Sequence, residues 1–376
     1  MPKRLPSEPP VLPGLTYVRP LGSGGFADVF LYAQDMPRRQ VAVKVLPTGI
    51  HDAELLRMFN AEADILAHLS AHPSIVTVYQ AGISADGRPY IVMEFCPGSL
   101  AQRYRLERLP LDEVLTIGVK MASAVETAHR AGLVHRDIKP SNILITTFGS
   151  PVLADFGISS SLAPTGGGEV LAMSVPWSAP EVIAEQTAGT VASEVWGLGA
   201  TVYSLLAGHS PFERPEAGQN SRDQLRRRIQ RASFPTMRRP DVPAQVLEVL
   251  QVAMARDPQD RYPSALAFAQ ALRDVQHALG FPPSPLEVAV DEWVPGDSTV
   301  DVRDAAARGP LISSVPHASR RRAPTAAPLT ARDEDTDISA PVVHPSRRAW
   351  PWIVTGAVVV VAVALVVWAV ASGGVA

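Results

Sequence analysis

The segment from Val134 to Ile145, with the sequence VHRDIKPSNILI, constrains this 376-residue chain more than any other feature. It places a carboxylate at Asp137, an ammonium group two residues later at Lys139, and a carboxamide five residues later at Asn142. A polar turn between strands is the simpler interpretation, but a turn requires neither these three groups nor their order. Such groups can orient a hydroxyl and accept its proton, neutralise a phosphoryl group and bind Mg²⁺. The segment therefore predicts phosphoryl-transfer chemistry.

A second acidic motif, Asp155-Phe156-Gly157, follows about a dozen residues after the first one. Taken alone, this tripeptide is ordinary turn chemistry. After the first motif, a better interpretation is that the Asp155 carboxylate binds Mg²⁺ and bridges the phosphates of a nucleotide.

A glycine-rich segment, Leu21-Gly22-Ser23-Gly24-Gly25, lies between two predicted strands near the N-terminus. Glycines let a backbone close over phosphates with its N–H groups facing the charge. A hairpin without a ligand and a dinucleotide-binding loop are the alternatives. The second alternative requires a helix after the loop, whereas a predicted strand, Val29 to Ala33, follows here.

Two charged residues are predicted on the apolar faces of neighbouring elements. Lys44 lies in the alternating strand Val41–Leu46, and Glu62 lies in a predicted helix, His51–Leu69. Because either charge is costly to bury alone, we expect an ion pair that leaves the lysine free to hold phosphates. A lysine that reaches solvent and a solvated glutamate are the alternatives.

In these motifs the sequence resembles the protein kinase superfamily, specifically the bacterial Ser/Thr kinases that are similar to the eukaryotic ones. The resemblance covers about residues 15–278. It implies an α+β, two-lobed fold with a β-rich N-lobe and an α-helical C-lobe, with ATP and Mg²⁺ (or Mn²⁺) between the lobes. It further implies transfer of the γ-phosphate to Ser and Thr hydroxyls of protein substrates.

The resemblance also assigns roles to individual residues. Asp137, Lys139, Asn142 and Ser174 form the catalytic set, and Asn142 and Asp155 hold the metal ion. Met93 corresponds to the gatekeeper, and Glu94 and Cys96 to the hinge that binds adenine. The residues expected at the nucleotide are Leu21, Gly22, Ser23, Gly24, Gly25, Val29, Ala42, Lys44, Glu62, Met93, Glu94 and Cys96.

The sequence departs from the family pattern at four positions, and at one of them, Ser174 in place of the usual threonine, the hydroxyl is kept. Ala179-Pro180-Glu181 matches the family segment, and Glu181 is expected to pair with Arg261. Met173 replaces the usual glycine and Trp177 the usual tyrosine, which puts the shape of the substrate site in question. Glu194 replaces the aspartate that normally bonds the backbone of the catalytic loop.

The resemblance suggests regulation by a phosphate that pairs with Arg136. The loop from Ile158 to Met173 contains four candidate acceptors, of which Thr165 is favoured over the others. The other three candidates are Ser159, Ser160 and Ser161. Activation of this kind implies self-association, so that one copy phosphorylates another.

The C-terminal part predicts a tether to a membrane. Residues 279–349 are rich in Pro, Ala, Ser, Arg and Asp, as in a disordered linker, whereas residues 350–371 are almost wholly apolar and long enough to span a bilayer. Arg347 and Arg348 precede this span, which predicts a cytoplasmic kinase domain and an extracytoplasmic tail, 372–376. Residues 1–14 are predicted to be an N-terminal extension.

Composition excludes some classes of protein. The single cysteine, Cys96, rules out a disulfide framework within the chain, and the net charge of −3 gives no overall bias toward nucleic acid. The basic run Arg226-Arg227-Arg228, with Arg231, Arg238 and Arg239, is interpreted as a solvated surface, with acidic substrates or anionic lipid as alternatives.

Three other functions are weighed against a protein kinase. A pseudokinase scaffold would share the fold, but the lysine, glutamate, asparagine and both aspartates of the motifs are all present. A kinase of small molecules would share the catalytic aspartate, but the Ala179-Pro180-Glu181 segment belongs to a peptide-binding lobe. A membrane anchor that recruits partners, with catalysis secondary, is the third alternative.

Overall fold

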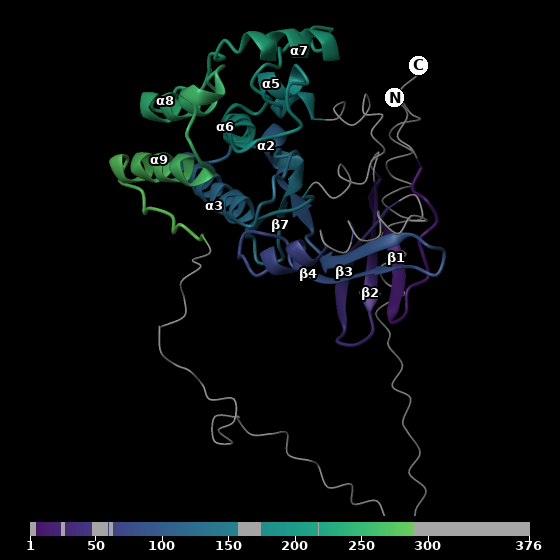
Figure 1. The fold of residues 1–376 in the computed structure, drawn as a ribbon. Coiled ribbons are helices and arrows are strands. Elements are labelled where there is room, and N and C mark those ends of the chain that lie inside the picture. The colour runs from purple at the N-terminus through teal and green to yellow at the C-terminus, as the bar shows by residue number, and fades with distance from the viewer. Residues whose placement is uncertain are drawn as a thin grey trace, which may run out of the picture. The chain divides into compact units, whose positions relative to one another are not determined.

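The computed structural model of the chain describes residues 5–23, 27–46, 59, 63–156, 174–216 and 218–288. The chain divides into two compact units, Met1–Gly296 and Asp297–Ala376, and every described residue belongs to the first unit (Figure 1). Within the described ranges, no helix has the length and apolar character needed to cross a membrane. Several predictions lie outside these ranges: Gly24, Gly25, Glu62, the loop 157–173 with its candidate phosphorylation sites, and everything assigned to 289–376.

The N-lobe is built on a five-stranded antiparallel sheet with the strand order β1-β2-β3-β5-β4. Its strands are β1 (Leu15–Ser23), β2 (Asp28–Gln34), β3 (Arg39–Val45), β4 (Val78–Ile83) and β5 (Pro89–Glu94). The predicted alternation in β3 is confirmed, because Val41, Val43 and Val45 are fully buried on one face while Lys44 lies on the other. Of the predicted helix after β3, Phe59 and residues 63–69 are described, and they are helical.

Residues 5–12, here called the N-terminal strap, pack on the outer face of this sheet. Leu12 is 3% exposed and joins a cluster with Phe30, Tyr32 and the three β3 valines. The Tyr32 hydroxyl donates a hydrogen bond to the Pro10 carbonyl (2.6 Å). The outer face is rich in aromatic and β-branched side chains, so it requires a cover, and part of the predicted extension supplies one.

The C-lobe is helical and confirms the predicted two-lobed fold. A small sheet of β6 (Gly98–Ser99), β7 (Ile143–Ile145) and β8 (Pro151–Leu153) carries the predicted motifs. The helices are α2 (Leu100–Leu106), α3 (Leu111–Arg130), α5 (Pro180–Ile183), α6 (Val191–Ala207), α7 (Arg222–Arg231), α8 (Ala244–Ala253) and α9 (Ala265–Ala278). Short 3₁₀ turns cover Pro140–Asn142, Val175–Trp177 and Pro258–Asp260.

Helix α6 is the centre of this lobe, where it contacts α2, α3, α8 and α9 (Figure 1). A capping box between Thr190 and Ser193 begins the helix, and Gly208 ends it in the left-handed conformation. Nearly every α6 residue is buried, and the Trp196 side chain is fully so. A helix that is buried all round is expected to be apolar all round, which makes its buried carboxylate, Glu194, exceptional.

The first ten residues assigned to the linker, 279–288, are packed rather than disordered. Ser284 is 5% exposed, and its N–H donates to the Gln276 side-chain oxygen (2.9 Å). Further on, the Glu287 carbonyl forms a hydrogen bond with the ring of His72. Burial lowers the pKa of this histidine. The proline-rich composition predicts disorder here, but the buried amide of Gln276 on α9 needs partners, and this segment supplies them.

This packing predicts that a kinase fragment must extend to Val288. A fragment that ends at Gly280 loses the hydrogen bonds of Ser284 and Glu287 and the packing of Leu286. We expect its free energy of unfolding to be lower by about 2–4 kcal/mol than that of a fragment ending at Val288. Urea unfolding of both fragments measures the difference. Equal unfolding midpoints would show that residues 281–288 contribute nothing to the domain.

Candidate active site

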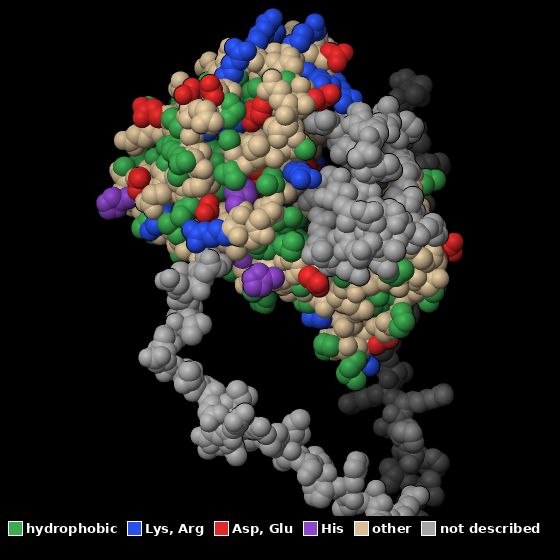
Figure 2. All heavy atoms as spheres, viewed as in Figure 1, with side chains coloured by type: hydrophobic (Ala, Val, Ile, Leu, Met, Phe, Trp, Pro, Cys, Tyr) green, Lys and Arg blue, Asp and Glu red, His purple; other side chains and the backbone are tan. Residues whose placement is uncertain are grey.

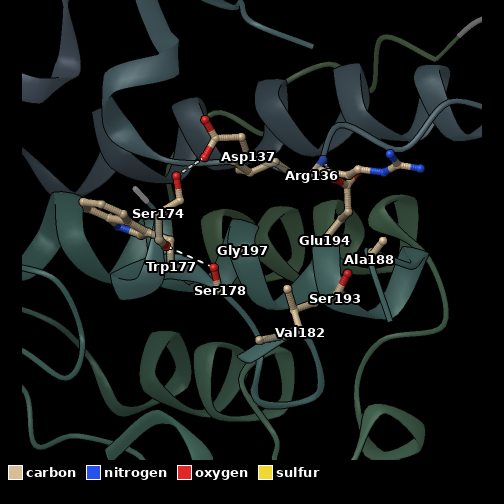
Figure 3. Close-up of a pocket in the computed structure, with 13 residues that line it drawn as sticks. Arg136, Asp137, Ser174, Trp177, Ser178, Val182, Ala188, Ser193, Glu194 and Gly197 are labelled. Atoms are coloured by element: carbon tan, nitrogen blue, oxygen red, sulfur yellow. Dashed lines mark hydrogen bonds between the residues drawn. The ribbon is translucent and has the colours of Figure 1, made fainter. Parts of the chain in front are cut away.

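The catalytic loop brings four of the predicted residues together around the Asp137 carboxylate. Lys139 Nζ lies 2.7 Å from Asp137 Oδ2, and Asn142 Nδ2 lies 2.9 Å from the same oxygen. The Ser174 hydroxyl donates to the other oxygen, Oδ1, and accepts a hydrogen bond from Lys139 Nζ (2.8 Å). Figure 3 shows Ser174 facing Asp137 from the opposite side of the loop. The serine that replaces the usual threonine therefore keeps its hydroxyl in contact with both charged groups.

A buried histidine joins the two motifs that the sequence identified. His135 is fully buried, and its Nε2–H donates to the Ala154 carbonyl (3.0 Å). Its Nδ1 accepts from the Asp137 N–H (3.3 Å), and its ring centroid lies 4.5 Å from that of Phe156. The sequence predicts no role for this residue, although it opens the His-Arg-Asp triplet. It fixes the peptide of Asp137 against the strand that leads to Asp155.

Lys44 contacts Asp155 directly, at 2.8 Å between Nζ and Oδ1. The predicted partner, Glu62, lies outside the described residues, so that ion pair stays a prediction. The Lys44 ammonium holds the pKa of the Asp155 carboxyl below its usual value. Asp155 therefore stays ionised at neutral pH, as a ligand for a divalent cation should.

Oxygen atoms suited to Mg²⁺ are present on Asn142 and Asp155. Both hydrogen bonds of Asn142 to Asp137 use the amide nitrogen, and its side-chain oxygen accepts a long hydrogen bond from the Ser141 hydroxyl (3.4 Å), which leaves that oxygen able to bind a cation as well. The Ala154 N–H donates to the Asn142 carbonyl (2.9 Å), which holds the residue before Asp155 against Asn142. A carboxylate kept charged beside a carboxamide oxygen fits a hard cation, so the residues present fit the predicted metal.

The predicted adenine-binding residues converge at the junction of the lobes. In the register of β3 and β5, Ala42 lies opposite Met93 and Val41 opposite Glu94. The Glu94 N–H is already bonded to the Thr77 carbonyl (2.8 Å). Burial raises the pKa of the Cys96 thiol to about 12, so it stays protonated. The main core cluster includes Leu21, Val29, Ala42, Met93 and Cys96.

Glu194 performs the contact expected of the aspartate that it replaces. Its Oε1 accepts from the Arg136 backbone N–H (2.5 Å), and its Oε2 accepts from His129 Nε2 (2.8 Å). The carboxylate is buried, with 3% of the residue exposed. The extra methylene is therefore accommodated with both oxygens bonded, and helix α6 is linked to helix α3 and to the catalytic loop.

The predicted ion pair between Glu181 and Arg261 is confirmed. The two guanidinium nitrogens lie 2.7 and 2.8 Å from the two carboxylate oxygens, and the arginine side chain is fully buried. The remaining Arg261 N–H groups donate to backbone carbonyls, including that of Ala255 (2.8 Å). A bidentate, fully bonded pair of this kind fixes α5 to the helical core.

A recess beside Asp137 is lined by Ser174, Trp177, Ala188 and Gly189 (Figure 3). The Trp177 indole N–H donates to the Ser204 hydroxyl (3.0 Å), so the residue that replaces tyrosine is anchored to α6. The recess therefore has a fixed wall next to the carboxylate, as a site for an extended substrate requires.

The basic run on and after α7 divides into structural and exposed arginines. Figure 2 shows Lys and Arg side chains gathered over α7. Arg228 donates to the Phe212 carbonyl (2.8 Å), and Arg239 is buried against Asp241 and two backbone carbonyls. Arg226 donates to the carbonyl of Ile183 (2.9 Å). Half of the run therefore holds the lobe together, which differs from the solvated surface predicted for the whole run. The exposed members are Arg227, Arg231 and Arg238.

Comparison with known proteins agrees with this geometry. The protein kinase domain family matches residues 15–274. The serine/threonine-protein kinase PknK of Mycobacterium tuberculosis is 38% identical over 337 residues, which cover 86% of this chain and 30% of PknK. PrkC of Bacillus subtilis is 36% identical over 256 residues, which cover 66% of this chain and 38% of PrkC. The chain thus spans about a third of the length of these relatives.

Among solved structures, the crystal structure of the M. tuberculosis PknI kinase domain is similar, with a TM-score of 0.52 and 31% sequence identity. The similarity covers 70% of this chain and 95% of the PknI chain. It therefore extends over nearly the whole of that domain.

The bonds of Glu194 predict a large effect of its removal. Glu194→Ala leaves the Arg136 N–H and the His129 ring N–H buried without an acceptor, so we expect a loss of about 2–5 kcal/mol in the free energy of unfolding. Glu194→Asp, one methylene shorter, should keep one of the two bonds, so its free energy of unfolding should lie between those of the wild type and Glu194→Ala. The matched control is Glu248→Ala, which removes an exposed carboxylate on α8. Chemical unfolding of the three variants decides, and an alanine variant as stable as the control would contradict the assignment.

Proposed function

The chain belongs to the protein kinase family, and on that premise we propose that it transfers the γ-phosphate of ATP to Ser and Thr hydroxyls of proteins. The observation that carries the proposal is the set of groups around the Asp137 carboxylate. A lysine, an asparagine and a serine hydroxyl all contact it, and the charged Asp155 is held two residues beyond the β8 strand. Relatives that are named serine/threonine-protein kinases support the choice of hydroxyl acceptor.

In this mechanism Asp137 orients the substrate hydroxyl and accepts its proton as the oxygen attacks the γ-phosphorus. Lys139, which contacts Asp137, neutralises charge on the phosphoryl group as it moves. Asn142 and Asp155 would hold Mg²⁺, which neutralises phosphate charge when bound. Because little covalent work falls to the protein, the fixed positions of these groups supply most of the rate.

The acceptor side of the site supports a protein substrate rather than a small molecule. The recess beside Asp137 continues along Trp177 and the segment that Glu181 anchors to Arg261. An open, rigid wall of this kind suits an extended peptide chain. A scaffold without activity would not need Asp155 to be held ionised by Lys44, so the geometry also favours an enzyme over a pseudokinase.

Replacing the central carboxylates should remove the activity. We expect Asp137→Asn to lower phosphate transfer to a protein substrate by at least about 100-fold, because the proton acceptor is lost in the transition state. Asp155→Ala should abolish Mg²⁺-dependent transfer. Transfer of radiolabelled phosphate from ATP measures both, with Asp223→Asn on exposed α7 as the control. Substantial activity in either active-site variant would overturn the assigned roles.

We also propose that a phosphate on the loop 158–173 activates the enzyme, with Thr165 the favoured acceptor. Arg136 supports this, because its side chain is exposed and points away from Asp137 (Figure 3). Among the described residues, no carboxylate forms an ion pair with it. Such an arginine is suited to a phosphate, and one copy of the chain would supply it to another.

We further propose that residues 350–371 anchor the chain in a membrane, with the kinase domain on the cytoplasmic side. The support is the length and apolar character of that segment and the two arginines before it. A membrane raises the local concentration of one copy near another, which favours phosphorylation between copies.

The anchor and the activation together predict how self-phosphorylation depends on concentration. The full chain in liposomes should phosphorylate itself rapidly even when dilute, whereas a fragment ending at Val288 should do so slowly and recover as its concentration rises. The rate of autophosphorylation against enzyme concentration measures this, and mass spectrometry locates the phosphate. A fragment whose rate is independent of concentration, or active protein without phosphate in residues 158–173, would contradict the proposal.

A further inference from the structure

We infer that Ser7 in the N-terminal strap is a positioning residue for the two strand ends that flank the glycine-rich turn, and that it acts through Asp28. The inference rests on the proposed function in one respect, which is that this turn covers the phosphates of ATP. The sequence predicts only an N-terminal extension for residues 1–14.

The strap runs from the glycine-rich end of the sheet to the opposite end. At the far end, Leu12 forms a β-bridge with Leu15, where strand β1 begins. At its middle, the Pro10 carbonyl accepts from Tyr32, and burial raises the pKa of that phenol to about 12, so the hydroxyl remains a donor. At the near end, Ser7 reaches the first residue of β2, Asp28.

The Asp28 carboxylate connects the strap to the glycine-rich segment. Its Oδ2 accepts from both the N–H (2.9 Å) and the hydroxyl (2.6 Å) of Ser7. Its Oδ1 accepts from the hydroxyl of Ser23 (2.7 Å), which lies opposite Asp28 in the register of β1 and β2. Asp28 is fully buried, and a buried carboxylate is stable only where donors surround it. Ser7 and Ser23 therefore share one carboxylate, with the strap on one side and the glycine-rich segment on the other.

Arg88, next to the β4–β5 turn, holds Ser7 in this position. Its NH1 donates to the Ser7 hydroxyl (3.1 Å), and its NH2 donates to the Glu8 carbonyl (2.9 Å). Asp86 orients the guanidinium from the turn itself, with 2.7 Å between its Oδ2 and Arg88 Nε. Hydrogen bonds thus connect the β4–β5 turn to Ser23 through the strap.

Loss of the Ser7 hydroxyl removes one donor from a buried carboxylate that also holds Ser23. Asp28 then gains by turning toward water, which releases Ser23 and loosens the strand ends that carry the glycines. The groups around Asp137 are unaffected, because none of them contacts the strap. Nucleotide binding should therefore weaken while the transfer step keeps its rate.

The test compares Ser7→Ala with Glu8→Ala in the full chain. Glu8 is the matched control, because only its backbone carbonyl is used. We expect Ser7→Ala to raise the KM for Mg·ATP by about 5- to 10-fold, the effect of one hydrogen bond to a charged group, with kcat within about twofold. Ser7→Thr, which keeps the hydroxyl, should restore the KM. Hydrogen exchange of the nucleotide-free protein should be faster over residues 19–30 in Ser7→Ala alone.

A merely structural strap gives a different result. It would lower the unfolding temperature of Ser7→Ala but leave the KM for ATP and the exchange of residues 19–30 equal to those of the control, and this would overturn the inference. If the wild-type chain transfers no phosphate, the proposed function falls. The hydrogen-exchange comparison of Ser7→Ala with the control then still tests whether Ser7 positions the strand ends, because it requires neither ATP nor activity.

Discussion

The buried carboxylate of Glu194 is the interaction on which the rest of the active site depends. It sits in helix α6, where every residue from Glu194 to Leu206 is buried and a charge without donors would be very costly. Its two donors come from the end of α3 and from the backbone of the catalytic loop. The buried charge therefore constrains the catalytic loop, because the backbone N–H of Arg136 must lie where it can donate to Glu194.

From this anchor the site extends through short, bonded steps. His135 ties the peptide of Asp137 to the residue before Asp155, and Asp155 in turn meets Lys44 of the N-lobe. These contacts join the catalytic loop to the strand before Asp155, and Asp155 to strand β3 of the N-lobe. The arrangement explains how the reactive carboxylates are positioned, because each contacts a side chain that other residues hold in place.

Sequence reasoning predicted this site where its parts are contiguous or periodic. Asp137, Lys139 and Asn142 lie close together in the sequence, and the alternation of β3 predicts on which face of the strand Lys44 lies. Sequence reasoning is less informative where two interacting residues lie far apart along the chain. For Lys44 the helical pattern predicts Glu62 as the partner and gives no indication of Asp155, which lies 111 residues further along the chain. The partnership of Glu194 with His129 and that of Ser7 with Asp28 join residues without any periodic relation, so burial and geometry alone reveal them.

The packing of the segment after α9 has a mechanical consequence. Glu287, near the end of the described residues, bonds His72 and, at 3.2 Å, the Ser74 hydroxyl. The Ser74 carbonyl accepts from the N–H of Leu153, two residues before Asp155. A force on this segment is therefore borne first by these few hydrogen bonds and not by helix α9. Two hydrogen bonds, Glu287–Ser74 and Ser74–Leu153, thus connect this segment to the strand that leads to Asp155, so a force on the segment is transmitted toward the active site.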